Sequence, residues 1–262
     1  MLEIVGSKMK TITPSFRVLG VRIDAVKTFE AVARMERLIE TSKTCSYVAV
    51  TGMHGIAEAQ QDPGFREILN QADLVVPDGM PLVWLARWHR HPLRRRVPGS
   101  ELMEAFCKKT GPRYRHFFYG GTPEVAQDLA RQLRDRFQIT IAGTYTPPFR
   151  PLTTEEEKEL ASLVDKSRPD VLWVGLSTPK QERWIYEHRD KLKVAIMLGV
   201  GAAFDMNSGR LRRAPRWMQD NGLEWLFRLL AEPRRLWKRY LVTIPSSMWA
   251  VSLELFHIRK FE

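Results

Sequence analysis

Short apolar runs alternate with amphipathic stretches along most of the chain. The apolar runs predict strands at residues 16–23, 45–50, 74–76, 115–119, 139–145, 171–175 and 194–198. Between them, apolar residues recur at helical spacing over residues 25–40, after residue 55 to about 70, and over 80–89 and 100–109. Strands that alternate with helices indicate an α/β fold, a mostly parallel sheet with helices on both faces in a Rossmann-like arrangement.

Three further helices are predicted from the residues that start them. Thr122 can cap a helix that has Pro123 in its first turn, and Thr153 precedes three glutamates in a capping-box pattern. A third helix is expected to start within Ser177–Glu182. These starts place helices between the later strands and extend the alternating pattern toward residue 200.

The alternation stops near residue 206. Residues 210–240 contain nine Lys or Arg against three Asp or Glu, interleaved with tryptophans and other aromatic residues. We therefore predict an α/β catalytic domain over residues 1–206 and a helical basic appendage over residues 207–262. No internal repeat or low-complexity tract is present.

Composition limits the classes of molecule that the chain is expected to bind. Its 262 residues are 44% hydrophobic, enough for a full core, and its net charge of +11 suits an anionic partner. Two cysteines provide neither a disulfide framework nor a metal cluster, and the first ten residues lack the apolar run of a signal peptide. No stretch approaches the roughly 20 apolar residues of a membrane-spanning helix. A cytoplasmic setting is expected.

Unusual residues follow the predicted strands. Turns of this kind occur at residues 51–55, 77–79, 120–122, 175–181 and 199–205. Parallel strands end at one edge of a sheet, and ligands of such sheets bind beyond that edge, so these turns should gather there. Asp78 is the one acid directly after the run at 74–76. The pair Asp78–Gly79 is also a common turn, so a reactive acid and a plain turn both stay open.

Two of these turns suit an anion. Gly120 and Gly121 allow a ligand to approach the backbone, and the helix after Thr122 offers unpaired N–H groups to a phosphate. Lys180 adds a cation and Gln181 adds a group that both donates and accepts hydrogen bonds. A tight turn and a well-capped helix start explain the same residues.

Several familiar sites are missing. There is no Walker A sequence, and no two aspartates are separated by one residue, so the metal-binding pair of many nucleotide-sugar enzymes is absent. Gly199–Phe204 has Phe204 where the dinucleotide fingerprint needs glycine, which argues against a hydride-transfer enzyme. His89 and His91 lie in an arginine-rich loop that is predicted to be solvated. No metal and no cofactor are expected.

The segment Gly222–Val242 combines an apolar face with arginines and tryptophans. This pattern is typical of a helix at an anionic lipid surface, and it also fits a helix packed on its own domain with a solvated face. Arginines bind phosphates in pairs of hydrogen bonds, so the segment suits a membrane, a diphosphate, or both. Its apolar surface can be covered by lipid or by a second subunit. Residues 244–258 are too short to span a bilayer.

Several motifs together resemble the WecG/TagA/CpsF glycosyltransferase family. They are Val75–Gly79, Phe118–Gly121, Gly175–Glu182, Gly199–Asp205, Arg213–Pro215, Gly222–Leu226 and Glu232–Pro233, within a similarity from about residue 17 to 242. The resemblance implies an inverting, metal-independent transfer from a UDP-sugar to a polyprenyl-diphosphate-linked sugar at the cytoplasmic face of the membrane. Such enzymes build teichoic-acid linkages, common antigens and exopolysaccharides.

The resemblance also implies roles for residues. Asp78 is the expected base that takes the proton of the acceptor hydroxyl, and Arg228, Arg235 and Arg239 are the expected diphosphate ligands. The expected donor-site residues are Thr51, His54, Gly79, Gly120, Gly121, Thr122, Gly175, Pro179, Lys180, Gln181 and Asp205.

One departure concerns the donor sugar. The family often has Thr-Pro-Asn where this chain has Thr51-Gly52-Met53, and Met53 cannot hydrogen-bond a sugar as asparagine does. His54 is the candidate replacement. The donor sugar is expected to be N-acetylmannosamine or a related sugar, with a uronic acid still open.

The alternative function is nucleic-acid binding, because the chain is basic and mixes arginines with tryptophans. The distribution of these residues argues against it. The turns after the strands carry glycines, an acid and a threonine, as a small-molecule pocket does, and the basic run lies on a helix with an apolar face. No nucleic-acid partner is expected.

Overall fold

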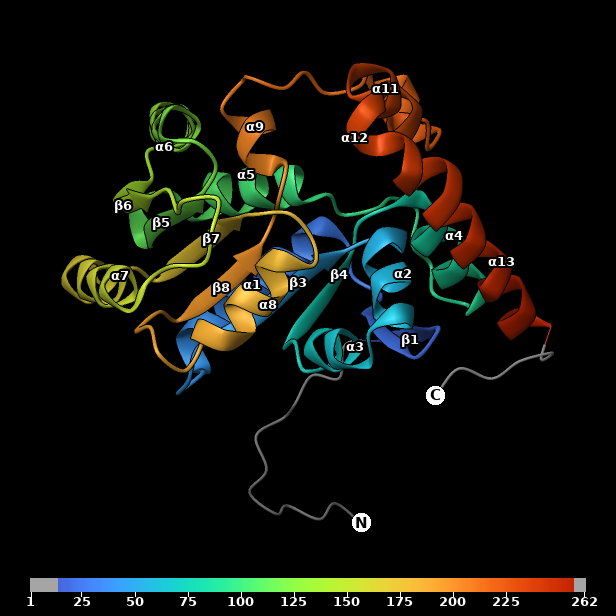
Figure 1. The fold of residues 1–262 in the computed structure, drawn as a ribbon, viewed down its shortest axis with the longest axis horizontal. Coiled ribbons are helices and arrows are strands. Elements are labelled where there is room, and N and C mark those ends of the chain that lie inside the picture. The colour runs from blue at the N-terminus through green and yellow to red at the C-terminus, as the bar shows by residue number, and fades with distance from the viewer. Residues whose placement is uncertain (1–13, 257–262) are drawn as a thin grey trace, which may run out of the picture.

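The computed structural model describes residues 14–256, apart from the side chain at position 220. Its centre is a six-stranded sheet with the order β4-β3-β8-β7-β5-β6 (Figure 1). The strands are β3 (Ser46–Thr51), β4 (Leu74–Pro77), β5 (Arg115–Gly120), β6 (Thr140–Tyr145), β7 (Val171–Gly175) and β8 (Ile196–Gly199). Every pairing in this sheet is parallel, which confirms the predicted α/β class.

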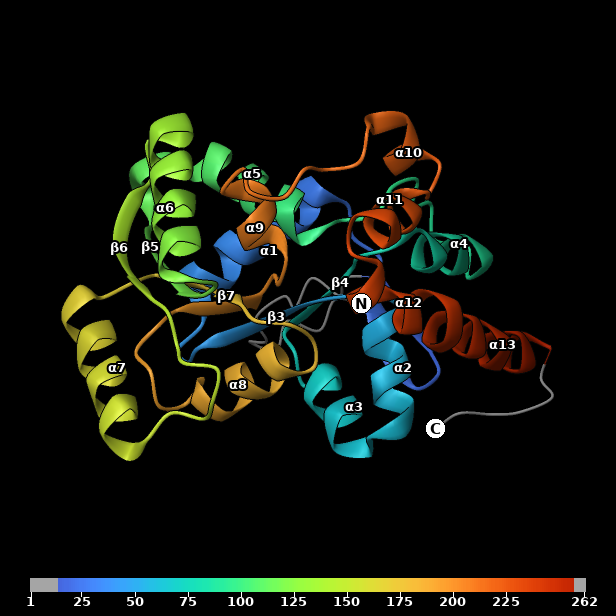
Figure 2. The same ribbon diagram turned by 45° about the horizontal axis from the view of Figure 1, so that its top comes forward.

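Helices cover both faces of the sheet (Figures 1 and 2). One face is covered by α1 (Thr28–Thr41), α5 (Gly99–Thr110), α6 (Pro123–Phe137) and α9 (Ala203–Asn207), whose apolar residues pack with Trp173 and other strand residues. The other face is covered by α2 (Met53–Gln61), α3 (Pro63–Asn70), α7 (Thr154–Ser167) and α8 (Lys180–His188). A short helix, η1 (Gly111–Arg113), follows α5. The molecule has two apolar layers because the inner strands of the sheet are buried on both sides.

Residues 16–23 do not form the single strand that the sequence predicts. They form an antiparallel hairpin, β1 (Ser15–Val18) and β2 (Val21–Asp24), outside the main sheet. The turn residues Leu19 and Gly20 both have positive φ, 49° and 78°, which reverses the chain without a polar break. The residues on both sides of the turn are apolar, so the hydrophobic pattern gave no sign of a turn there.

The helical stretch predicted up to residue 70 is two helices. Asp62 ends α2 and caps α3, where its Oδ1 accepts a hydrogen bond of 3.0 Å from the Phe65 amide, and a proline follows it directly. The predicted caps Thr122 and Thr153 are confirmed at α6 and α7. At Thr153 the capping box is complete, because the Glu156 carboxylate accepts from the Thr153 amide at 2.8 Å.

The segment after α9 is helical, as predicted. It contains α10 (Arg216–Asp220), α11 (Glu224–Ala231), α12 (Pro233–Lys238), a π-helical turn η2 (Arg239–Thr243) and α13 (Ile244–Leu255). Figures 1 and 2 draw α13 beside α2, and Figure 2 shows α4 (Met80–Trp88) on the opposite side of α13. The end of α13 is tied to the hairpin, since Glu254 Oε2 accepts from the Leu19 amide at 3.0 Å.

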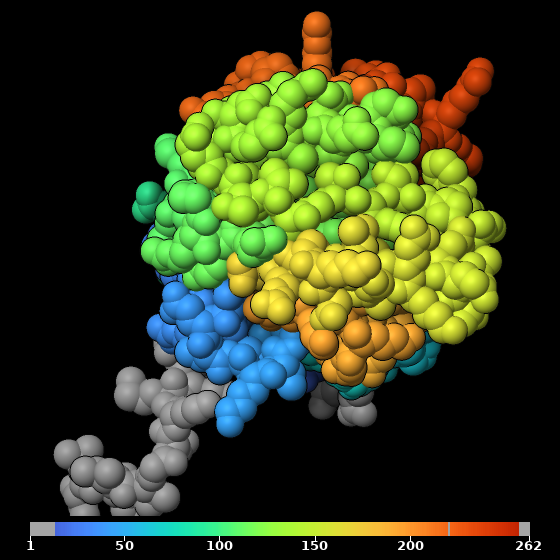
Figure 3. Space-filling view, turned by 90° about the vertical axis from the view of Figure 1, so that its left-hand side faces the viewer, coloured from blue at the N-terminus to red at the C-terminus, as the bar shows by residue number. Residues whose placement is uncertain are grey.

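The boundary at residue 206 and the division into two domains stay predictions. Their outer ends, residues 1–13 and 257–262, lie outside the described residues. Within residues 14–256, no helix has the length and hydropathy needed to cross a bilayer. The face in Figure 3 consists mainly of residues coloured green to yellow, from α5 to α7, with residues of the C-terminal helices at its upper rim.

Candidate active site

The candidate site is a cavity of about 720 Å³ at the carboxyl edge of the sheet. From the edge it is lined by residues of the turns 50–55, 78–81, 175–181 and 200–206, and from the C-terminal segment by residues between 222 and 248. All six strands run in one direction, so these turns meet at one edge. The predicted gathering of the five turns at one edge is confirmed, and four of them line the cavity. The fifth, residues 120–122, is not part of the lining.

Asp78 lies in this cavity directly after β4. Its amide donates to the carbonyl of Thr51 at 2.8 Å, which joins the turns after β4 and β3. Gly79 has a φ of 146°, open only to glycine, and a Cβ on Gly52 would collide with the carbonyl of Asp78. These two glycines allow the turns to approach closely. The Asp78 side chain is about one-third exposed, at 35%, and faces the cavity among its lining residues.

Arg96 binds Asp78 and was missed by the sequence analysis. Its Nη1 donates to Asp78 Oδ1 at 3.0 Å, and its Nη2 forms an ion pair with Glu224, the first residue of α11. Burial lowers the pKa of Arg96, but the carboxylates of Asp78, Glu224 and Glu101 more than offset this and raise it. Neither partner is close to Arg96 in sequence, so no local pattern indicated the contact.

The loop around Arg96 was expected to be solvated, and its other residues largely fit this. Arg94 and Arg95 are exposed. His89 and His91 pack their rings against Phe16, with ring centroids 5.5 and 5.7 Å apart. Across the part of the chain that the structure describes, no group of three or more His, Cys, Asp or Glu is placed to hold a metal ion.

The three predicted diphosphate ligands come together in the cavity. Arg228, Arg235 and Arg239 all line it. Burial, followed by the charges of Arg228 and Arg235, lowers the pKa of Arg239. The Arg228 Nε is buried and has no hydrogen-bond partner among the described residues. Nearby, burial raises the pKa of Asp205, with Arg235 opposing it, and Arg235 also pairs with Glu232 at 2.5 Å. The arginines therefore form a partly neutralised cluster with capacity for an anion.

Two more polar side chains, His54 and Gln181, line the cavity where α2 and α8 begin. Burial and then the charge of Arg239 lower the pKa of His54 to about 4, so its ring is neutral near pH 7. Gln181 is buried, and its Nε2 donates to Glu182 at 2.9 Å. The Gln181 Oε1 has no partner in the described chain and lies 3.5 Å from a Cβ built on Gly201. His54 and Gln181 can therefore offer hydrogen bonds to an uncharged ligand such as a sugar or a base.

Six predicted donor residues do not line the cavity. Thr51 is buried beneath it, Gly120 pairs with Gly175 in the sheet, and Gly121 packs near Phe204. Thr122 caps α6, Pro179 precedes α8 and Lys180 is exposed at its start. Helix capping and strand packing account for the glycines and for Thr122, so their part in donor binding stays a prediction. His54, Gly79, Gly175, Gln181 and Asp205 do line the cavity.

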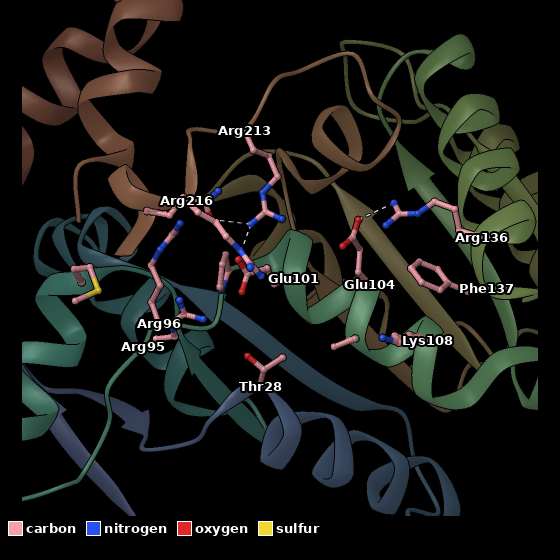
Figure 4. Close-up of a pocket in the computed structure, with 14 residues that line it drawn as sticks. Thr28, Arg95, Arg96, Glu101, Glu104, Lys108, Arg136, Phe137, Arg213 and Arg216 are labelled. Atoms are coloured by element: carbon pink, nitrogen blue, oxygen red, sulfur yellow. Dashed lines mark hydrogen bonds and ion pairs between the residues drawn. The ribbon is translucent and has the colours of Figure 1, made fainter. Parts of the chain in front are cut away.

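A separate basic groove of about 470 Å³ adjoins the cavity and shares Met80, Arg96 and Pro98 with it. Six arginines or lysines and two glutamates line it, so it is basic. Figure 4 shows that two of these arginines turn toward acids of α5: Arg213 toward Glu101 at 2.7 Å, and Arg136 toward Glu104 at 2.8 Å. Much of its charge is therefore held in ion pairs.

The part of the main cavity between α4 and α13 is apolar. There α4 contributes Met80, Pro81 and Trp84, while η2 and α13 contribute Leu241, Ile244, Pro245 and Met248. Large exposed apolar side chains also occur on α4 and the C-terminal helices. They include Trp84, Trp88, Trp225, Trp237, Leu241, Val242, Trp249 and Phe256.

Comparison with known proteins places these features in a family. Residues 16–260 match the model of the Glycosyl transferase WecG/TagA/CpsF family. An N-acetylglucosaminyldiphosphoundecaprenol N-acetyl-beta-D-mannosaminyltransferase of Bacillus spizizenii is 35% identical over 196 residues, 74% of each chain. A protein of the same name from Staphylococcus aureus is 27% identical over 250 residues, 95% of this chain and 96% of that one. The chain therefore belongs to the WecG/TagA/CpsF family and is a glycosyltransferase, as its motifs predicted.

Proposed function

We propose that the protein is an inverting transferase that moves a sugar from a UDP-sugar to a polyprenyl-diphosphate-linked sugar. The single observation that carries this proposal is the cavity itself. The carboxylate of Asp78 lies in a cavity that also contains the arginine cluster Arg228, Arg235 and Arg239 and an apolar end. A base, a cationic site and an apolar site are what a transfer between a nucleotide sugar and a lipid-linked sugar requires.

The polarity of the cavity supports a lipid-linked acceptor. Hydrogen-bonding side chains such as Gln181 lie near the strand ends, arginines lie on the C-terminal helices, and apolar residues such as Trp84 and Ile244 line the part between α4 and α13. A polyprenyl diphosphate sugar has the same three chemistries in one molecule: a sugar, an anion and a hydrocarbon chain. The acceptor would place its diphosphate at the arginines and its first isoprene units between α4 and α13.

In the proposed reaction, Asp78 removes the proton of the acceptor hydroxyl as its oxygen attacks the anomeric carbon of the donor. The bond from that carbon to the UDP oxygen breaks, and its electron pair leaves with UDP. Attack from the face opposite UDP inverts the configuration. The arginines Arg228, Arg235 and Arg239 compensate the charge on the diphosphates, so the reaction needs no metal ion.

The relatives suggest which sugars take part. Both are named for transfer of N-acetylmannosamine to N-acetylglucosaminyldiphosphoundecaprenol. We infer the same donor and acceptor classes for this chain in cell-surface polysaccharide synthesis. At His54 the neutral ring offers a hydrogen bond to the donor in place of the asparagine that is common in the family. The donor sugar is therefore N-acetylmannosamine or a related sugar in this proposal.

Binding to the inner face of the cell membrane completes the proposal. The C-terminal helices carry exposed tryptophans, Trp237 at 52% and Trp249 at 68%, together with many arginines. Tryptophans favour the headgroup region and arginines favour anionic lipid. Because α4 also exposes Trp84 and Trp88 beside the apolar end of the cavity, this surface would put that end against the bilayer.

The first test is sugar transfer by an Asp78→Asn enzyme. UDP-sugars are first screened for protection against thermal unfolding, since a ligand of the folded state raises the melting temperature. With the donor that binds, we expect Asp78→Asn to lower kcat by roughly 10²- to 10⁴-fold, the usual loss for a general base. Asp190→Asn, at an acid whose side chain is 81% exposed, is the control and should keep wild-type turnover. Near-normal turnover by Asp78→Asn would exclude the base role.

The second test is sedimentation with vesicles. The protein should sediment with vesicles that contain phosphatidylglycerol and less with pure phosphatidylcholine, and Trp249→Ser should weaken the binding. Duplex DNA is the comparison, because salt-sensitive binding to DNA without binding to vesicles would favour the nucleic-acid alternative. Dissociation of a dimer by Trp249→Ser, with unchanged vesicle binding, would assign the surface to a second subunit.

A further inference from the structure

Three charged side chains form a row from the C-terminal helices to the candidate base. Glu224 of α11 pairs with Arg96 Nη2, and Arg96 Nη1 donates to Asp78 Oδ1 at 3.0 Å. The three residues come from distant parts of the sequence. The side chains of Glu224 and Arg96 are mostly buried, 11% and 14% exposed, while that of Asp78 is more open at 35%.

A backbone hydrogen bond and two ion pairs hold Arg96 in place. The Val97 amide donates to the carbonyl of Pro77 at 2.8 Å, so the loop lies against the end of β4. An arginine side chain has several rotatable bonds, so holding it in one position costs conformational entropy. Two carboxylates, one at each Nη, hold the guanidinium in a single position between them. Without Glu224, one of these two restraints is lost.

We propose that Glu224 is a positioning residue that acts on Asp78 through Arg96, an inference that rests on the proposed base role of Asp78. Glu224 fixes Arg96, and Arg96 fixes Oδ1 of Asp78, which leaves Oδ2 outside the ion pair for the acceptor proton. Glu224 touches neither substrate nor the reacting atoms in this arrangement. It sets the orientation of the group that does.

The position of Glu224 on α11 gives this contact a further consequence. Arg228 lies four residues later, so both side chains project from the same face of the helix, and both line the cavity. When α11 is docked as in this structure, its Arg228 lies in the cavity and its Glu224 holds Arg96 against the base. The base is held in place only when the cations that stabilise the leaving diphosphate are also present.

A different explanation is that the Glu224–Arg96 pair only fastens the C-terminal helices to the α/β core. The two roles affect different measurements. Loss of a fastening lowers the melting temperature and raises KM for the acceptor, because the arginines leave the cavity. Loss of base positioning lowers kcat with little change in KM, because the bound acceptor meets a misoriented carboxylate.

The test compares Glu224→Gln with Glu104→Gln in the full chain. Glu104 is the matched control, because it pairs with Arg136 at 2.8 Å in the basic groove and does not line the cavity. We expect Glu224→Gln to lower kcat by roughly 10- to 100-fold, with acceptor KM within about twofold of wild type. Glu104→Gln should match wild type. An unchanged kcat for Glu224→Gln, or a change in KM alone, would overturn the inference.

A double-mutant cycle with Arg96 tests whether Glu224 acts through it. In an Arg96→Gln background, Glu224→Gln should lower kcat no further, because the connection to Asp78 is already broken. Fully multiplicative losses would mean that the two residues act separately, against the inference. Asp78→Asn, measured in parallel, separates the two proposals. High turnover by Asp78→Asn would refute the base role, whereas low turnover by Asp78→Asn with normal turnover by Glu224→Gln would refute only the positioning role.

Hydrogen exchange gives a readout that does not need activity. The amides of Asp78 and Val97 are bonded to the carbonyls of Thr51 and Pro77 at 2.8 Å each. Both should exchange faster in Glu224→Gln than in wild type, because the side chains that join these turns are freed. Amides in α7, far from the cavity, should be unchanged. Wild-type exchange at Asp78 and Val97 would show that Glu224 does not hold this region.

Discussion

Gly175 can be tested as a packing residue against its predicted part in donor binding. It ends β7 and lies beside Phe204 of α9, whose ring is buried with 1% exposure. A Cβ built on Gly175 would lie 2.6 Å from both Cδ1 and Cδ2 of that ring. Gly175 is not among the glycines with positive φ, so alanine strains no backbone angle there. Gly175→Ala therefore isolates the effect of one added methyl group.

The expected loss follows from overpacking a closed core. Phe204 meets Phe118 edge-on at a centroid distance of 6.1 Å and has no free space to turn into, so either α9 or the ring must shift. Overpacking of this kind costs about 1–3 kcal/mol. For a chain of this size, each kcal/mol lowers the melting temperature by roughly 2–4 °C. Calorimetry of Gly175→Ala should therefore show a melting temperature about 2–12 °C lower than wild type. Urea titration should show a free energy of unfolding that is lower by about 1–3 kcal/mol.

The double variant Gly175→Ala/Phe204→Leu identifies the cause. Leucine is smaller than phenylalanine, so the added methyl group should cost less in the Phe204→Leu background than in wild type. The reasoning fails if Gly175→Ala is as stable as wild type, or if its cost is the same in both backgrounds. A stable Gly175→Ala with weaker protection by UDP-sugars would instead assign the glycine to donor binding.

Three other predictions concern pH, capping and anion binding. Burial lowers the pKa of His54 from 6.5 to about 4, so its contribution to stability is complete above pH 6.5 and is lost as the pH falls toward 4. In His54→Gln, the free energy of unfolding from urea titration should fall less between pH 6.5 and 4, by on the order of 3 kcal/mol. Thr153→Ala should cost about 1 kcal/mol through the cap of α7 without changing kcat. Arg239→Ala should weaken UDP binding in calorimetry by roughly tenfold or more, whereas Arg234→Ala, which is exposed outside the cavity, should not.

The sheet and its helices could be predicted because they depend on local patterns. Strands buried on both faces are uninterrupted apolar runs, and helices with one buried face repeat their apolar residues at helical spacing. The position of the cavity followed from the same information. Parallel strands share a carboxyl edge, so Asp78 and Gln181 could be expected there without any knowledge of strand order. The order itself, β4-β3-β8-β7-β5-β6, had no signal in the pattern.

The contacts between distant segments could not be predicted from the sequence. Arg94, Arg95 and Arg96 look alike as a run, and nothing in the run indicates that Arg96 meets the carboxylate of Asp78, directly after β4, and that of Glu224 in α11. Gly120 looked like a phosphate-binding turn, whereas a Cβ there would lie 2.6 Å from the carbonyl oxygen of Gly175, so its small size serves strand packing. In both cases the deciding neighbour comes from a segment that the local pattern does not indicate.

The location of the arginines on the C-terminal helices has an electrostatic reason. The sheet edge offers the N-termini of helices such as α4 and α8, each equivalent to about half a positive charge. The proposed reaction would bring two diphosphates into one cavity and would need more than this, and Arg228, Arg235 and Arg239 would supply full charges. Burial, and after it the charges of Arg228 and Arg235, lower the pKa of Arg239, and the repulsion among the three arginines opposes docking of the helices while the cavity is empty. A bound diphosphate turns that repulsion into attraction, so ligand binding and docking of α11 and α12 must favour each other by the same free energy.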